Sequence, residues 1–305
     1  WRLQFWGDAD MVLIIGLALD SNLENNGVAP SWPANPKRIV VQESAVDAWA
    51  PLPVEVEIIG NPKLVLRQMI DCAKGMMKGT PKRTAWLEHM RRIREDYQRA
   101  SRGCAEEMSQ HKPIHGFWLA QEIVDFLDPS ATIIYDSYSG SSHLSGRIQA
   151  KFAGQVLDAG EAAGVGHGIG MGIGAQLARP GKQVFVMMGD GGIGIAGMDI
   201  ETAVRYKLPV VYLIYNNSTW MGGIEHIYMQ GQMDSWGMLP DIRYDKMFEP
   251  LGCHAEHVTE PGQIRPALER AFNSGKTAVV NVIVDQRVLH PYHVGNLMRR
   301  MALVN

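Results

Sequence analysis

Two apolar runs in the middle of the chain end in polar residues, and this pair of segments restricts the fold most. Gln183–Met188 leads into GDGG, and Val210–Tyr215 leads into a doubled asparagine. The pattern between them, Ala196–Tyr206, is helical. A strand, a helix and a second strand of this kind form a unit whose strands run parallel. Ligands bind beyond the carboxyl ends of such strands, so we expect Asp190 and Asn217 to converge there.

The rest of the chain alternates strand and helix in the same way, which predicts an α/β fold with doubly wound parallel sheets. Residues 1–80 have the elements of half a nucleotide-binding-type domain, a partial Rossmann-like domain. Residues 81–112 form a linker that contains the amphipathic helix Pro81–Gln98, and residues 113–305 form a second domain. The other predicted strands are Met11–Leu17, Arg38–Gln42, Val54–Ile59, Thr132–Asp136, Gln155–Leu157 and Ala278–Asp285.

Composition narrows the class of protein. Hydrophobic residues make up 46% of the 305 residues and charged residues 20%, and the net charge is −3, which is typical of a soluble globular protein and argues against nucleic acid as the main partner. Three separated cysteines without a CxxC pair indicate reduced thiols and a cytoplasmic location. The longest apolar run is too short to span a bilayer. Because the chain opens at Trp1, we expect a segment upstream of it.

The residues at the two strand ends suit a hard cation. Asp190 offers an anionic oxygen and Asn217 a neutral one, which favours Mg²⁺ or Ca²⁺ over Zn²⁺, and the Thr219 carbonyl could add a third ligand. Gly191 and Gly192 leave backbone amides open to a phosphate group. Asp-Gly and Asn-Asn are also ordinary turn dipeptides. The presence of both motifs after apolar strands favours a metal-bridged diphosphate site.

The spacing GDG(x)₂₄NN resembles the cofactor motif of the thiamin diphosphate-dependent decarboxylases, lyases and synthases. Within this superfamily the segments Gly197–Asn217, Leu157–Gly160 and Gly166–Ala178 are most similar to 2-hydroxyacyl-CoA lyase and oxalyl-CoA decarboxylase. The resemblance implies thiamin diphosphate as cofactor, with Asp190, Asn217 and the Thr219 carbonyl as Mg²⁺ ligands. The cofactor-binding residues that we predict are Gly166, Gly168, Gly189, Gly191, Gly192, Asn217, Thr219, Trp220 and Met221.

The same resemblance implies that part of the active site lies elsewhere. In the superfamily a glutamate on a separate pyrimidine-binding domain of the neighbouring subunit activates the cofactor. We find no such domain in this sequence, so we expect it on a partner chain or segment, in a dimer or tetramer of such units. The predicted substrate is a small acyl-CoA or oxoacid, and no membrane partner is expected.

Three residues are candidates for catalysis: His167, Met221 and His226. His167 stands where the superfamily places a large apolar residue that supports the bent cofactor; it is either a helix-start histidine with satisfied ring nitrogens or an acid/base residue. If the alignment shifts by two positions, Val165 is the supporting residue. Met221, Glu225 and His226 follow the segment Asn217–Thr219 that carries two of the implied metal ligands. The superfamily places residues over the thiazolium there, and these three could equally lie in a solvated loop.

Three further groups have simpler alternatives. Ser137 and Tyr138 follow a strand and could face substrate or form a turn. The cluster His290–Asn296 has two histidines but lacks a third metal ligand. Glu43 stands where a Rossmann-like domain often binds a ribose, or it is a surface residue.

The leading hypothesis is a carbon–carbon lyase acting on 2-hydroxyacyl-CoA or 2-oxoacyl substrates, to which this chain gives the metal–diphosphate half of the site. A 2-oxoacid decarboxylase or acetolactate-synthase-like carboligase is the second. A non-catalytic subunit is the third, and the intact Asp190 and Asn217 argue against it.

Overall fold

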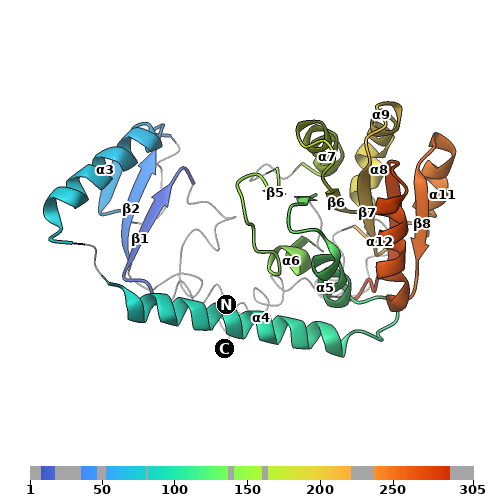
Figure 1. Cartoon of the computed structure of the whole chain (residues 1–305), viewed down its shortest axis with the longest axis horizontal. Helices are drawn as coiled ribbons and strands as arrows, with labels where there is room; N and C mark the ends of the chain where they lie inside the picture. Colours follow the sequence, from blue (N-terminus) through green and yellow to red (C-terminus); the bar gives the residue numbers. More distant parts are fainter. Residues whose placement is uncertain are drawn as a thin grey trace. The chain divides into compact units, whose positions relative to one another are not determined.

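A computed structural model describes residues 8–17, 36–46, 53–79, 82–136, 141–159, 164–220 and 237–288 of the chain. The chain divides into two compact units, Trp1–Ala100 and Ser101–Asn305. The division falls inside the long helix α4 (Thr84–Glu107), which Figure 1 shows in cyan to green.

The first unit contains a three-stranded parallel sheet. The central strand β2 (Lys37–Gln42) pairs with β1 (Met11–Ile15) on one side and β3 (Val56–Ile59) on the other. Helix α3 (Pro62–Met76) follows β3, and the side chain of Asn61 caps it by accepting hydrogen bonds from two backbone amides of its first turn. The strands occur where the apolar runs predict them.

Helix α4 extends beyond the predicted Pro81–Gln98 and ends at Glu107. Its last turns are held by tertiary contacts that a local pattern does not show. Arg102 forms a two-bond ion pair with Asp125 of helix α5 (Gly116–Phe126), and Ala105 is fully buried. In the described part of the chain no helix combines the length and apolar character needed to cross a membrane.

The second unit is built on a six-stranded sheet in which every pair of strands is parallel. The spatial order is β5-β4-β6-β7-β9-β8. The chain runs from β4 outward to β5 and then returns to the other side of β4 as β6, so the topological switch point lies between β4 and β6. The strands are β4 (Thr132–Tyr135), β5 (Val156–Leu157), β6 (Val184–Gly189), β7 (Val210–Asn216), β8 (His254–Val258) and β9 (Ala278–Ile283).

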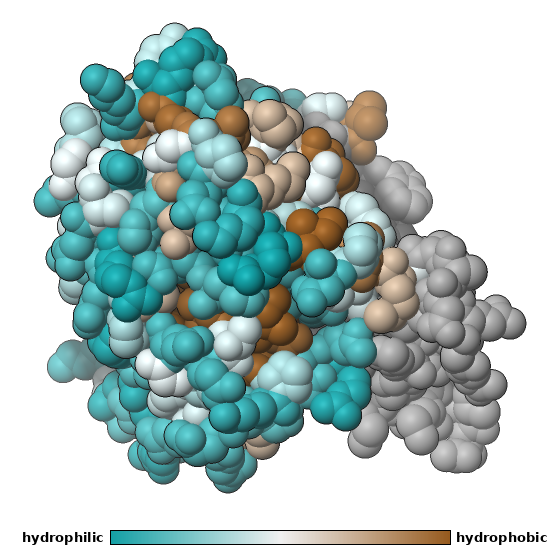
Figure 2. Space-filling model, turned by 90° about the vertical axis from the view of Figure 1, so that its right-hand side faces the viewer, coloured by the Kyte–Doolittle hydropathy of each residue, from teal (hydrophilic) through white to brown (hydrophobic). Residues whose placement is uncertain are grey.

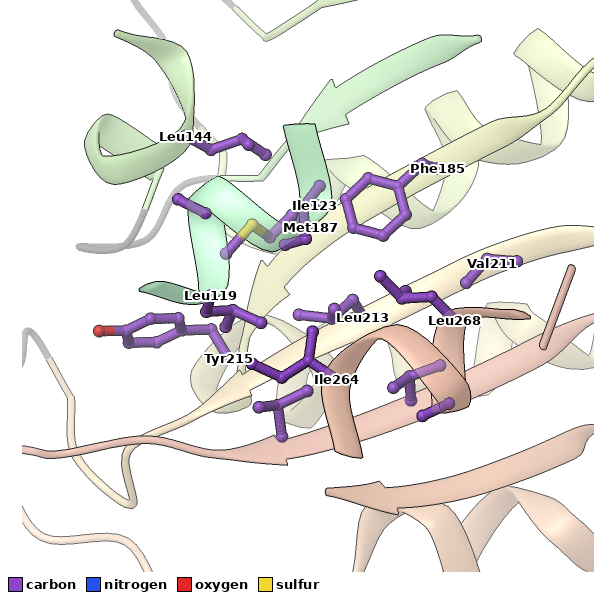
Figure 3. Close-up of a cluster of buried hydrophobic side chains, with 14 of the residues drawn as sticks. Leu119, Ile123, Leu144, Phe185, Met187, Val211, Leu213, Tyr215, Ile264 and Leu268 are labelled. Carbon is purple, nitrogen blue, oxygen red and sulfur yellow. The ribbon is translucent and has the colours of Figure 1, made fainter. Parts of the chain in front are cut away.

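Helices cover both faces of this sheet, as the predicted doubly wound fold requires. One face packs against α5, α6 (Ser141–Ser145) and α12 (Ile264–Asn273). Figure 3 shows this core, in which Leu119 and Ile123 of α5 and Ile264 and Leu268 of α12 pack against Phe185, Met187, Val211, Leu213 and Tyr215 of the central strands. The other face packs against α7 (His167–Ala178), α8 (Asp190–Ala196), α9 (Ile200–Arg205) and α11 (Tyr244–Phe248).

The pattern between the doubled asparagine and Pro261 does not predict α11 and β8. Helix α11 has only five residues, too few to show a helical pattern. Strand β8 has the sequence HAEHV, in which His and Glu interrupt the apolar alternation. Glu256 is paired within the chain: Arg270 of α12 donates to both of its carboxylate oxygens, at 2.8 and 2.7 Å. The face of the second unit that carries these elements is largely hydrophilic, with hydrophobic residues in small groups (Figure 2).

Candidate functional site

The carboxylate of Asp190 lies at the carboxyl end of β6, beside the topological switch point. The residue is only 3% exposed. Its Oδ1 accepts a hydrogen bond from the Gly191 amide at 2.9 Å, whereas its buried Oδ2 has no hydrogen-bond partner among the described residues. Burial raises the pKa of Asp190 to about 6, although the backbone amides of Gly191, Ser218 and Thr219 favour the ionised form. The structure therefore brings Asp190 against the loop that follows β7.

That loop contains Asn217, Ser218 and Thr219. Asn217 is half-buried, and its Oδ1 accepts a hydrogen bond from the Thr219 amide at 3.3 Å. Ser218 has a φ of 53°, a left-handed conformation that is uncommon for a residue other than glycine. Thr219 is 3% exposed, and its Oγ1 is buried without a partner among the described residues. Two polar oxygens, one from Asp190 and one from Thr219, thus lie buried and unpaired in this region.

A short antiparallel bridge between Thr219 and Met238 fixes the far end of the loop. The Trp220 amide donates to the Gly237 carbonyl, and the Leu239 amide donates to the Ser218 carbonyl, each at 2.8 Å. These two bonds do not use the Thr219 carbonyl, which we predicted as a metal ligand.

Two glycines after β6, Gly191 and Gly192, let the side chains of Trp220 and Asp136 pack closely against the backbone. Gly189 ends β6, and α8 begins at Asp190. A Cβ added to Gly191 would lie 2.9 Å from the ring of Trp220, and one added to Gly192 would lie 3.1 Å from Oδ1 of Asp136. A side chain at either position would displace a neighbour.

Asp136 is a site residue whose role the sequence did not indicate. It follows β4, is 2% exposed, and accepts hydrogen bonds from the Gly166 amide at 2.9 Å and the Gly168 amide at 2.7 Å. The carboxylate therefore holds the first turn of α7, and both glycine amides are already paired within the chain. The only sequence signal was the place of Asp136 at the end of an apolar strand.

The ring of His167 lies against the backbone in the same turn. Its Nδ1 is 2.5 Å from the Gly164 carbonyl oxygen, and its Nε2 is 2.8 Å from the Tyr135 carbonyl oxygen. The side chain is 14% exposed. Both ring nitrogens face backbone carbonyl oxygens, and a neutral ring, which has one N–H, can donate to only one of them. An acid/base role for His167 stays a prediction.

Of the remaining candidates, the structure describes Glu43. Glu43 is exposed, and its Oε1 accepts a hydrogen bond from the side-chain amide of Asn61. Six predictions concern residues that lie outside the described part of the chain: Met221, Glu225, His226, Ser137, Tyr138 and the segment His290–Asn296.

Within the described ranges, no group of three or more His, Cys, Asp and Glu side chains is arranged to hold a metal ion. The predicted set contains only one such residue, Asp190, together with an amide oxygen and a backbone carbonyl. The unpaired Oδ2 of Asp190 and the unpaired Oγ1 of Thr219 are the features that fit a hard cation with oxygen ligands.

Comparison with known proteins identifies the family of this region. Residues 140–282 match the family described as "Thiamine pyrophosphate enzyme, C-terminal TPP binding domain". The match includes α7, Asp190 and the loop after β7. It confirms the predicted resemblance to thiamin diphosphate-dependent enzymes.

Longer alignments relate nearly the whole chain to three kinds of enzyme. The chain is 33% identical over 293 residues to "Acetolactate synthase large subunit IlvG" of Mycobacterium tuberculosis, covering 95% of the chain and 51% of that protein. It is 27% identical over 287 residues to a 2-hydroxyacyl-CoA lyase of Arabidopsis thaliana, covering 92% and 50%. It is 25% identical over 281 residues to an oxalyl-CoA decarboxylase of Escherichia coli, covering 91% and 49%. The chain thus spans about half the length of these relatives.

Proposed function

The chain belongs to the thiamin diphosphate-dependent enzyme superfamily, and on this premise we propose that it supplies the metal–diphosphate half of an active site that cleaves or forms a carbon–carbon bond beside a carbonyl group. The substrate in this proposal is a 2-hydroxyacyl-CoA or a related 2-oxoacyl compound. The observation that carries the proposal is the buried, unpaired carboxylate oxygen of Asp190 next to the loop after β7.

A buried anionic oxygen without a partner is unfavourable unless a cation compensates it. Mg²⁺ would accept Asp190, the Asn217 side chain and the Thr219 carbonyl as ligands and keep positions for water and for phosphate oxygens. The Trp220 ring lies against the Gly191 backbone, in space that a side chain at position 191 would fill. These residues would bind and orient the diphosphate.

Thiamin diphosphate, when bound, supplies the carbanion chemistry by accepting the electron pair that is released beside the carbonyl carbon. The residues of this chain have the supporting tasks of anchoring the diphosphate and fixing its position. Trp220 would cover the anchor, and we keep Gly166, Gly168, Gly189 and Met221 as proposed cofactor contacts. His167, Met221 and His226 remain the candidates for proton transfer.

The other half of the site is part of the proposal. A partner chain or segment would carry the pyrimidine-binding domain and the activating glutamate, in a dimer or tetramer of such units in the cytoplasm. We propose the division into residues 1–80, 81–112 and 113–305 on the same basis, with the first part as a partial Rossmann-like domain.

A second candidate function is supported by one observation. The chain is more similar to the mycobacterial acetolactate synthase, at 33% identity, than to the plant 2-hydroxyacyl-CoA lyase, at 27%. An acetolactate-synthase-like carboligase or a 2-oxoacid decarboxylase would use the same anchor, with free 2-oxoacids in place of acyl-CoA. The assembled enzyme should be offered both substrate classes, because turnover of free 2-oxoacids without turnover of acyl-CoA would decide for this second candidate.

Calorimetric titration with Mg²⁺ and thiamin diphosphate tests the anchor directly, on this chain alone and with the partner polypeptide. We expect Asp190→Ala to abolish retention of the cofactor. Asp199→Ala is the matched control, since Asp199 is exposed and follows α8 closely in the sequence. Equal retention by wild type and Asp190→Ala would refute the metal assignment. No binding by the wild type in either form would favour a non-catalytic subunit.

A further inference from the structure

A buried series of hydrogen bonds runs behind the metal loop, from Asp245 of α11 through two asparagines to Ser218. The Asn281 side chain on β9 donates to Oδ1 of Asp245 at 3.4 Å. The Asn216 side chain at the end of β7 donates to Oδ1 of Asn281 at 3.1 Å. Oδ1 of Asn216 then accepts a hydrogen bond from the Ser218 amide at 3.2 Å. Asn281 is fully buried and Asn216 is 1% exposed, so the two bonds of the series that Asn281 makes lie inside the protein, and the bond to Ser218 is partly buried.

The carboxylate of Asp245 determines the direction of the whole series. An ionised carboxylate only accepts hydrogen bonds, so Asn281 must turn its NH₂ group toward Asp245 and its oxygen toward Asn216. Asn216 must then donate to Asn281, which leaves its own oxygen facing Ser218. A flipped amide at either asparagine would set two donors or two acceptors against each other. Two further contacts support the same orientation, because both NH₂ groups also face the Ile242 carbonyl, at 3.3 and 3.5 Å.

Asp245 is itself held firmly. Arg243 pairs with both of its oxygens, at 2.8 and 2.6 Å, and the side chain of Asp245 is 4% exposed. The Asp245 oxygen that accepts from Asn281 is also 3.6 Å from Nδ1 of His257. The outer end of the series is therefore a fixed anionic acceptor.

The inner end of the series is the point where the loop needs support. Ser218 adopts a left-handed conformation, and it stands between Asn217 and Thr219, the two loop residues that we propose as metal ligands. A residue other than glycine keeps this conformation only where its surroundings hold it. The hydrogen bond from the Ser218 amide to Asn216 provides such a restraint.

We propose that Asn281 is a positioning residue for the cation site: together with Asp245 it orients Asn216, which holds the loop Asn217–Thr219 in its ligand-binding conformation. The inference rests on the proposed function, because it assigns this loop to Mg²⁺. It gives the first asparagine of the doubled pair a task distinct from that of the second. Asn216 supports the loop from behind, and Asn217 is the ligand.

The test compares Asn281→Leu with a variant that loses a different buried hydrogen bond of the same strand region. Leucine has a similar volume but cannot accept the hydrogen bond from Asn216. Thr277→Val is the matched control: Thr277 precedes β9 at its opposite end, is 2% exposed, and donates from Oγ1 to the Leu208 carbonyl at 2.7 Å. Two quantities are measured on the whole chain: hydrogen exchange of the loop amides without ligand, and the affinity for Mg²⁺ in the presence of thiamin diphosphate.

We expect Asn281→Leu to speed exchange at Ser218 and Thr219 at least tenfold and to weaken Mg²⁺ binding at least tenfold, whereas Thr277→Val changes neither by more than twofold. Wild-type exchange and affinity in Asn281→Leu would overturn the inference, and so would an equal loss of both in Thr277→Val. If the wild type binds no Mg²⁺ either alone or with the partner polypeptide, the proposed function fails, and the exchange data still decide whether Asn281 holds the loop.

A second variant covers the case in which Asn281→Leu does not fold. Asp245→Asn keeps the shape of the side chain but can present a donor to Asn281, so the direction of the series is no longer imposed. We expect a threefold to tenfold loss of Mg²⁺ affinity together with faster exchange at Ser218. Affinity and exchange equal to those of the wild type would overturn the inference.

Discussion

The backbone of Gly191 lies against the ring of Trp220, so closely that a Cβ at position 191 would stand 2.9 Å from the ring carbon Cζ3. This contact joins the residue after Asp190 to the residue after Thr219. It therefore connects the ends of β6 and β7, which carry the proposed ligands of the metal–diphosphate site. A substitution at Gly191 tests that connection.

We predict that Gly191→Ala displaces the Trp220 ring, lowers the free energy of unfolding by about 1–3 kcal/mol, and weakens binding of thiamin diphosphate with Mg²⁺. Gly194→Ala is the control on the same helix, because a Cβ there meets nothing within 4 Å. We expect that variant to be unchanged or more stable by about 0.5–1 kcal/mol. Urea unfolding and calorimetric titration measure both quantities, and equal behaviour of the two variants would contradict the assigned contact.

The strands and the strand ends that depend on local sequence patterns could be predicted from the sequence. The central strands β6 and β7 are buried along their whole length, so their apolar runs identify them, and the turn residues that follow them mark the strand ends. Asp190 and the loop after β7 converge because adjacent parallel strands bring their carboxyl ends together.

The roles of Asp136 and Asn281 could not be predicted because they depend on partners far away in the chain. Asp136 binds amides 30 and 32 positions later, and Asn281 accepts a hydrogen bond from Asn216 across 65 positions. One residue ends an ordinary strand and the other lies within an apolar one, so neither has a local signature. Only the order of the strands and the placement of α7 and α11 bring these partners together.

Asp136 gives a second prediction. Asp136→Ala removes both acceptors from the first turn of α7 and leaves the buried amides of Gly166 and Gly168 unpaired, so we expect the free energy of unfolding to fall by about 3 kcal/mol. Asp136→Asn cannot restore both bonds, because its NH₂ group would face an amide donor. Asp125→Asn is the comparison, since its partner Arg102 is exposed and such surface pairs contribute less than about 1 kcal/mol. Asp136→Asn with the stability of the wild type would show that these hydrogen bonds do not hold the turn.

Gly166 gives a third prediction, on the backbone of the same turn. Its φ is 93°, and a Cβ there would lie 2.8 Å from the Cβ of Ala196. We expect Gly166→Ala to destabilise the chain by about 2 kcal/mol, because both the conformation and the available space exclude a side chain. In Gly170→Ala, within α7, a Cβ meets nothing within 4 Å, so that variant should keep or gain stability. Thermal unfolding of the pair is the measurement, and a stable Gly166→Ala would disprove the steric argument.

The last prediction concerns pH. His115 caps α5 by accepting a hydrogen bond from the Phe117 amide at its Nδ1, which requires an unprotonated ring nitrogen. Burial, and then the nearby His111, lower the pKa of His115 to about 4 from its usual 6.5. The unfolded chain therefore binds a proton at this residue at a higher pH than the folded chain does. The contribution of His115 to stability is complete above pH 6.5 and is lost as the pH falls toward 4.

His115→Asn separates this titration from the cap. Asparagine is a favoured capping residue that does not titrate, so the variant should keep the stability of the wild type at pH 7 and lose about 1 kcal/mol less than the wild type between pH 6.5 and pH 4, a value discounted for the partial exposure of the ring. His115→Ala should lose about 1 kcal/mol at pH 7 because the cap is removed. Urea unfolding at a series of pH values measures all three chains. The same pH dependence in His115→Asn and the wild type would mean that the capping histidine does not set this part of the acid sensitivity.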